Sequence, residues 1–132
     1  MTERYFTLEE AQEIIPWVQS AFDSIHELSS KGIESRKTAS ALVEKMQSNG
    51  GSQHDEELNA LQISVQESTT VMQSTLDEFA SRGIIVRDVQ RGLIDFPSLR
   101  EGREVYLCWV DGETTIEFWH EVDTGFPGRQ PL

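Results

Sequence analysis

Five side chains in the last third of the sequence could together bind a small ligand. They are Asp95, Arg103, His120, Glu121 and Arg129. Imidazole and carboxylate groups serve as metal ligands and as general acids or bases, and the planar guanidinium of arginine binds carboxylates and phosphates through paired hydrogen bonds. We identify these residues as a candidate ligand-binding site and assign none of them a catalytic role.

A metal centre at His120 and Glu121 is a weaker interpretation. Zinc sites in proteins use three or four protein ligands. His26 and His54 fall in helical and loop segments without ligand spacing to His120, and Cys108 has no histidine opposite it in the strand pairing expected below. We therefore predict no metal and no cofactor, and a structural role for His120 and Cys108.

The arginines allow two interpretations. All five basic residues after Gly83 are arginines, namely Arg87, Arg91, Arg100, Arg103 and Arg129. A consistent choice of arginine suggests bidentate contacts, either with an external anion or with acidic residues of the chain. Nine acidic residues accompany these five arginines, so pairing within the chain is the favoured interpretation.

A hairpin centred on Asp111-Gly112 is expected to position these side chains. Asp-Gly is typical of a two-residue type I′ turn. That turn pairs Val105 with Phe118 and Arg103 with His120, and it places Trp109 and Trp119 on opposite faces of the hairpin. The open end of this hairpin would then hold Arg103 and His120.

Two further strands precede the hairpin in the prediction. Residues 84–86 and 93–96 are short apolar runs, and 97–102 contains Pro and Gly and is predicted as a loop. Residues 83–121 are thus expected to form a small antiparallel sheet of three or four strands. Residues 122–132 hold two Gly and two Pro and are predicted as an irregular tail.

Two long antiparallel helices are predicted to cover the sheet. The first, at 7–47, starts with the capping box Thr7-Leu8-Glu9-Glu10 and continues through Pro16; the second, at 54–82, ends at Gly83. A break is predicted at 48–53. The apolar seam of the first helix is interrupted by Ser29, Gly32 and Arg36, and that of the second by Ser68, Thr69 and Thr75. At about 1.5 Å per residue the first helix would be about 60 Å long and would extend beyond the sheet.

Composition defines the broad class of protein. The chain has 132 residues with a formal charge of -12 and a single cysteine. One domain of the α+β class, spanning 1–132, is expected. The acidic charge argues against binding to nucleic acids or acidic membranes, and the single cysteine and the absence of a leader or spanning segment favour a cytoplasmic protein.

Several sequence blocks resemble a known family. YFTLEEA at the start, RGLIDFPSLREGREVYLCW, FWHE and the final GFPGRQPL are similar to blocks of a small bacterial family classed as a domain of unknown function. The resemblance implies a helical hairpin combined with a small sheet, and it implies no activity.

Two functions are open on this basis. The first is a non-enzymatic interaction module, most simply a homodimer that pairs through the helical hairpin, or a module for another protein partner. The alternative is a small-anion or small-ligand site, possibly enzymatic, at the open end of the C-terminal hairpin. The length of the apolar seam favours the first.

Overall fold

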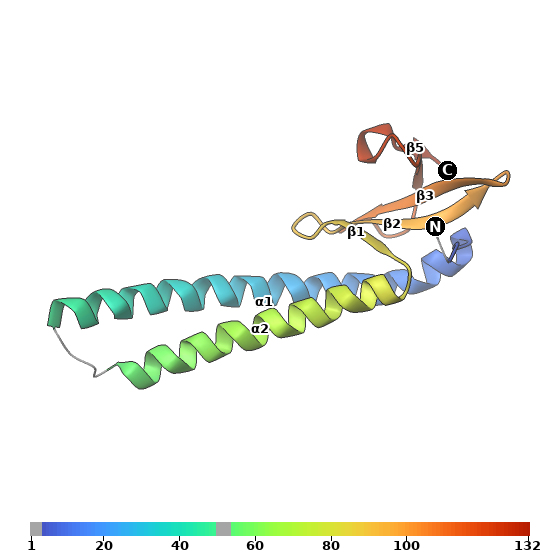
Figure 1. Cartoon of the computed structure of the whole chain (residues 1–132). Coiled ribbons are helices and arrows are strands. Elements are labelled where there is room, and N and C mark those ends of the chain that lie inside the picture. Colours follow the sequence, from blue (N-terminus) through green and yellow to red (C-terminus); the bar gives the residue numbers. More distant parts are fainter. Residues whose placement is uncertain (1–3, 50–53) are drawn as a thin grey trace. The chain divides into compact units, whose positions relative to one another are not determined.

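The computed structural model describes residues 4–49 and 54–132, and these residues form two helices and a five-stranded antiparallel sheet (Figure 1). Helix α1 spans Leu8–Asn49 and helix α2 spans Asp55–Ser81. The predicted α+β class and both predicted helices are confirmed. Residues 50–53 of the predicted break lie outside the described part of the chain.

The chain divides into two compact units. One contains the residues up to Asp23 together with Leu76–Leu132, and the other contains Ser24–Thr75. The first unit therefore holds the start of α1, the end of α2 and the whole sheet. The second unit holds the remainder of the two helices.

Local sequence signals define the first residue of α1 and the last residue of α2. The Thr7 hydroxyl accepts a hydrogen bond from the Glu10 N–H at 3.1 Å, and the Glu10 carboxylate accepts one from the Thr7 N–H at 2.9 Å. This is the reciprocal capping box that the sequence predicts. At the other end, Gly83 has a φ of 84°, and the Ile84 N–H donates to the Phe79 carbonyl at 3.0 Å, which closes α2 as a Schellman motif.

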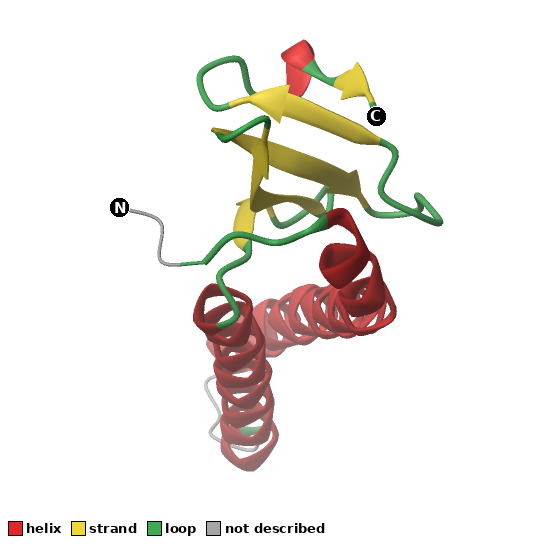
Figure 2. Ribbon diagram, turned by 90° about the vertical axis from the view of Figure 1, so that its right-hand side faces the viewer, coloured by secondary structure: helices red, strands yellow, loops and turns green. Residues whose placement is uncertain are grey.

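The sheet contains five strands in chain order, not three or four (Figure 2). They are β1 (Ile85–Asp88), β2 (Leu93–Arg100), β3 (Arg103–Val110), β4 (Phe118–Glu121) and β5 (Gln130–Pro131). β5 and the 3₁₀ turn η1 (Phe126–Gly128) occupy the segment predicted as an irregular tail. The additional strand arises because the chain returns after η1 and pairs with the free edge of β4.

Strand β2 includes residues 97–100, which were predicted as a loop. Its Pro97 carbonyl accepts a hydrogen bond from the Phe6 N–H at 2.7 Å. The nitrogen and carbonyl of a strand residue point toward the same side, so the proline nitrogen does not face β3 and no hydrogen bond of the β2–β3 ladder is lost. Glu101 and Gly102 then connect β2 to β3 with φ values of 54° and 78°, as a type I′ turn requires.

The predicted hairpin register around Asp111-Gly112 is wrong. Val105 pairs with Glu121, whereas the prediction placed it opposite Phe118. The Glu113 N–H closes the turn on the Val110 carbonyl at 3.0 Å, but Gly112 has positive φ and Asp111 does not, so the turn is not type I′ and does not continue into a paired strand. A three-residue shift reverses the face of every β4 side chain.

The absence of strand pairing in residues 111–117 has a structural cause. Ile116 is buried, and its N–H donates to the Gln12 side chain at 3.3 Å. The Trp109 indole donates to the Glu113 carbonyl at 2.8 Å. Through Ile116, residues 111–117 contact the core of the first unit and do not extend the pairing of β3 with β4. The burial of Ile116 and the hydrogen bond of the Trp109 indole compensate for the lost strand pairs.

One face of the sheet packs against the helices of the first unit. Trp109 stacks on Phe22 with a centroid distance of 6.2 Å, and Phe22 contacts Phe79 at 5.1 Å. Register and alternation place Leu107 and Trp119 on this face as well. Trp119 is consequently buried, at 6% exposure, and not on the face opposite Trp109 as predicted.

The second unit is a pair of antiparallel helical segments (Figure 1). Its inward positions follow an alternating three- and four-residue spacing, with Leu28, Gly32, Ser35, Ala39, Leu42 and Met46 on α1 and Leu58, Leu61, Val65, Ser68 and Met72 on α2. Every second α1 position lies one residue earlier than predicted, so Leu28 and Ser35 replace Ser29 and Arg36. No helix among the described residues has an apolar stretch long enough to cross a membrane.

Candidate functional site

A group of polar and titratable side chains lies on the sheet face that turns away from the helices of the first unit. β1 supplies Arg87, β2 Asp95, β3 Tyr106 and Cys108, and β4 His120. Asp95 pairs with Cys108, and Tyr106 pairs with His120 across the strands. Directly opposite residues have Cβ atoms about 5 Å apart, so four strands bring these five side chains together.

Asp95 is the centre of this group. Its Oδ2 atom accepts a hydrogen bond from Arg87 Nε at 2.9 Å, and its Oδ1 atom lies 2.9 Å from His120 Nε2. Asp95 and His120 are 2% and 1% exposed. The ring of Tyr106 lies against His120 with a centroid distance of 5.4 Å. A buried carboxylate is tolerated here because both of its oxygens have a polar partner.

The hydrogen bonds of His120 require a proton between His120 Nε2 and Asp95 Oδ1. His120 Nδ1 lies 2.8 Å from the Glu121 carbonyl, and a carbonyl can only accept, so Nδ1 carries a hydrogen. A neutral imidazole then presents the lone pair of Nε2 to Asp95. An ionised carboxylate also can only accept, so one proton must lie between Nε2 and Oδ1, on either the histidine or the aspartate.

Cys108 completes the group as a neutral thiol. Burial, followed by the negative charge of Asp95, raises the pKa of the Cys108 thiol to about 12. The side chain is fully buried. A thiol with this pKa is not a nucleophile at neutral pH, since the thiolate is the reactive form.

A cavity of about 350 Å³ gives access to this group. Arg87, Asp95 and His120 form part of its wall, together with residues of the segment that follows β4, namely Val122, Asp123, Thr124, Gly125 and Phe126. The cavity therefore joins the buried pair to the surface of the first unit. It has room for water or a small ligand next to Asp95 and His120.

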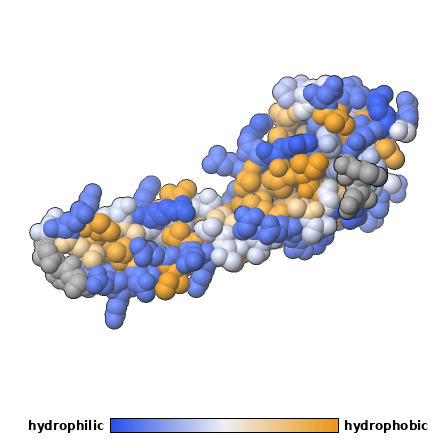
Figure 3. All heavy atoms as spheres, viewed as in Figure 1, coloured by the Kyte–Doolittle hydropathy of each residue, from blue (hydrophilic) through white to orange (hydrophobic). Residues whose placement is uncertain are grey.

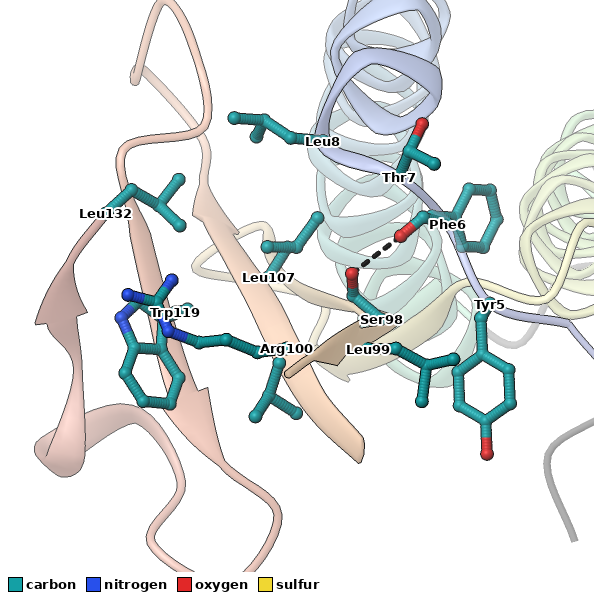
Figure 4. Close-up of a pocket in the computed structure, with 11 residues that line it drawn as sticks. Tyr5, Phe6, Thr7, Leu8, Ser98, Leu99, Arg100, Leu107, Trp119 and Leu132 are labelled. Carbon is teal, nitrogen blue, oxygen red and sulfur yellow. Dashed lines mark hydrogen bonds between the residues drawn. The ribbon is translucent and has the colours of Figure 1, made fainter. Parts of the chain in front are cut away.

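A second cavity, of about 550 Å³, lies on the other face of the sheet (Figure 4). Its lining is mostly apolar and includes Leu99, Leu107 and Trp119, and Arg100 is the charged side chain among the described residues that form it. The Ser98 hydroxyl donates to the Phe6 carbonyl at 2.6 Å, and Arg100 lies over the Trp119 ring at 4.5 Å. This cavity offers an apolar surface and no acid–base group comparable to the Asp95–His120 pair.

Comparison with known proteins gives a family but no activity. The model of an uncharacterised conserved protein family, DUF2203, matches residues 4–132. The chain belongs to the DUF2203 family. This result confirms the resemblance noted from the sequence blocks. No curated protein and no solved structure matches this DUF2203 chain.

The structure of this DUF2203 chain joins four of the five predicted site residues, in two separate pairs. Asp95 and His120 are in contact, whereas Arg103 forms an ion pair with Glu121, and Arg129 binds both carboxylate oxygens of Glu113 at 2.8 and 2.9 Å. Two more of the five arginines after Gly83 lie over aromatic rings. Arg91 is 4.6 Å from the Phe126 centroid, and Arg100 lies over Trp119. The arginines therefore bind groups of the chain itself.

Sequence reasoning missed Arg87, Tyr106 and Cys108 as members of the group. The β1–β2 pairing sets Ile85 opposite Asp95, and a register irregularity follows between Val86 and Asp88, so the contact of Arg87 with Asp95 follows no simple spacing rule. Cys108 was assigned a structural role because the expected pairing set no histidine opposite it, and that pairing was wrong. The cross-strand pair of Asp95 and Cys108 could have been found only by extending β2 through Pro97.

Proposed function

We propose that this DUF2203 protein is a non-enzymatic interaction module that forms a homodimer through the helical segments of its second unit, residues 24–75. The observation that carries the proposal is a groove of about 560 Å³ between α1 and α2. Its wall includes Leu42 and Leu61 from the inward positions of the two helices, together with Thr38, Lys45, His54, Glu57 and Ala60. Apolar side chains that should form a core are therefore open to solvent.

The contrast with the first unit supports this proposal. There, the α1 residues Ala11, Val18 and Phe22 are completely buried against neighbouring elements. In the second unit, the inward residues Leu42, Met46, Leu58, Leu61, Val65 and Met72 are only partly buried. Ile33 and Val71 are exposed to 50% and 49%, and Figure 3 shows apolar surface along this pair of helices. Two helices alone cannot remove a central layer from water, whereas four helices can.

Charge supports a second copy of the chain as the occupant. Residues 24–49 of α1 contain four basic and three acidic residues, including all three lysines of the chain, whereas residues 55–75 of α2 contain four acidic residues and no basic one. In a two-fold four-helix bundle, α1 of one copy can lie beside α2 of the other, which brings opposite charges together. Residues 24–75 hold seven acidic and four basic residues, so most of the chain's negative charge lies elsewhere.

A substitution at the groove tests the proposal. Ala60 is an exposed residue of the groove wall, so Ala60→Arg should leave the inward leucines in place and obstruct a second copy. We expect this variant to shift the mass measured by sedimentation equilibrium from dimer to monomer. Ala80→Arg is the matched control, because Ala80 is exposed on the same helix but belongs to the first unit. Equal masses for the two variants would contradict the proposal.

We also infer a cytoplasmic location, which is supported by the single cysteine of the chain.

An anion site at the open end of the C-terminal hairpin is less well supported than the dimer. The guanidinium groups of Arg103 and Arg129 are paired with Glu121 and Glu113.

A further inference from the structure

We propose that Asp95, Cys108 and His120 form a binding site for a divalent transition-metal ion of the zinc type. Each residue offers one ligand atom, and the three atoms lie within 4.8 Å of one another. All three side chains are buried, so the arrangement is held by the sheet and not by flexible surface residues. The site is independent of the dimer proposed above, which uses residues of the other unit.

The spacing of the three atoms fits a metal centre after small side-chain movements. Bonds of about 2.0 to 2.3 Å in tetrahedral geometry place ligand atoms about 3.3 to 3.8 Å apart. Asp95 Oδ1 and His120 Nε2 are 2.9 Å apart and would separate slightly. Cys108 lies directly opposite Asp95 on the neighbouring strand, and its Sγ atom lies within 4.8 Å of the other two ligand atoms.

Outer contacts hold two of the ligands in the correct orientation. The Nδ1–H of His120 donates to the Glu121 carbonyl, which leaves Nε2 as the metal-binding nitrogen. Arg87 donates to Asp95 Oδ2, so Oδ1, which faces His120 Nε2, is the oxygen that would bind the ion. Metal-binding histidines and carboxylates in proteins are typically fixed by contacts of this kind.

Asp95 Oδ1 and His120 Nε2 face each other at 2.9 Å, with one proton between them in the metal-free protein. A divalent ion would replace that proton and also the proton of the Cys108 thiol. One doubly charged ion enters and two protons leave, so the net charge of the buried group, including Arg87, stays the same. The exchange therefore adds no uncompensated buried charge.

The ligand types select the ion. One sulfur, one imidazole nitrogen and one carboxylate oxygen suit Zn²⁺ or Co²⁺, whereas Mg²⁺ and Ca²⁺ require oxygen ligands. Three protein ligands leave a fourth position, and the cavity of about 350 Å³ beside Asp95 and His120 can supply it with water. The same cavity provides the entry path.

Cobalt titration tests the site, because the chain has one cysteine and a thiolate–cobalt charge-transfer band can arise only from Cys108. We expect Co²⁺ to produce this band in the full-length protein, with saturation at one ion per chain, and Zn²⁺ to abolish it by displacement. Zn²⁺ should also raise the melting temperature. If Co²⁺ gives no such band and Zn²⁺ leaves the melting temperature unchanged, the proposal is overturned.

Variants separate this site from adventitious surface binding. Cys108→Ala should remove the band, and Arg87→Gln, which keeps all three ligands, should weaken zinc binding about 10- to 100-fold by releasing Asp95. His54→Gln is the matched control, because His54 lies beside Glu57 outside the group and should have no effect. Circular dichroism verifies that each variant is folded. Loss of zinc binding in His54→Gln, with Arg87→Gln unchanged in affinity, would contradict the assignment.

Discussion

At the scale of single residues, the Asp95 side chain links three strands of the sheet. It lies on β2, binds Arg87 from β1 and meets His120 from β4, which is not adjacent to β2 in the sheet. Both contacts have a length of 2.9 Å, and the one between Asp95 and His120 is buried, whereas the Arg87 side chain is 43% exposed. Removal of Asp95 would leave a buried histidine and an arginine without this partner, and such losses are expensive.

We therefore predict that Asp95→Ala lowers the free energy of unfolding by about 3 to 5 kcal/mol. Urea unfolding of the protein in a metal-chelating buffer measures this value without any contribution from bound metal. Glu27→Ala is the control, because Glu27 pairs with Lys31 in an exposed i,i+4 salt bridge that is worth about 0.3 to 0.5 kcal/mol. A cost for Asp95→Ala that is no greater than the control would show that the buried network does not hold the sheet.

The Cys108 thiol gives a pH prediction. Its folded pKa of about 12 lies above the ordinary value of 9.0, so the native protein retains a proton that the unfolded chain loses. Folding stability should therefore be unaffected by this group below pH 9 and should fall as the pH rises from 9 towards 12. Metal-free wild type and Cys108→Ala, compared by urea unfolding, isolate the effect. Parallel pH profiles for the two proteins would argue against a raised pKa.

At the scale of elements, two glycines have opposite roles. Gly32 lies inside α1, and an added Cβ there would have no atom within 4 Å. Gly102 has a φ of 78° in the turn between β2 and β3. Alanine favours a helix interior over glycine, whereas a side chain at positive φ is strained.

We predict that Gly32→Ala raises the free energy of unfolding by about 0.5 to 1 kcal/mol. Gly102→Ala should lower it by about 1 to 2 kcal/mol. Thermal unfolding of the two variants beside the wild type gives both signs in one experiment. The same sign for both variants would mean that the local backbone does not decide these effects.

The elements also show which features of this fold can be predicted from sequence. The capping box at Thr7 and the cap at Gly83 were correct because their hydrogen bonds join residues three to five positions apart. The pairing of β3 with β4 was wrong because Ile116 leaves the strand to reach the core and bind Gln12. That contact joins residues more than 100 positions apart, and no local pattern records it.

The same distinction explains the partial success at the candidate site. Asp95 and His120 were selected because carboxylate and imidazole are versatile groups, and they do meet. Arg103 was added from an assumed register, and Arg129 from the segment predicted as an irregular tail. In the structure Arg103 pairs with Glu121, and Arg129 pairs with Glu113, which was not a predicted site residue. Cys108 joins the group because β2 continues through Pro97 and sets Asp95 opposite it, which depends on the contact of Pro97 with the N-terminal segment.

At the scale of the whole molecule, chemistry and association are assigned to different parts of the chain. The first unit contains the buried network, its cavity and a well-packed core. The second unit contains helices whose inward side chains remain partly exposed. A protein that keeps apolar side chains in contact with water along a groove loses the stabilisation that their burial would provide. The proposed self-association would restore that stabilisation.

The most direct test of this account is the mass of the wild-type protein in solution as a function of concentration. Light scattering at moderate salt, in the low micromolar range and above, is suitable because screening weakens the repulsion between two acidic chains. The account predicts a mass of twice 15.0 kDa, with dissociation on dilution and a lower mass for Ala60→Arg at equal concentration. A mass of 15.0 kDa that stays constant as concentration rises would contradict homodimer formation through the second unit.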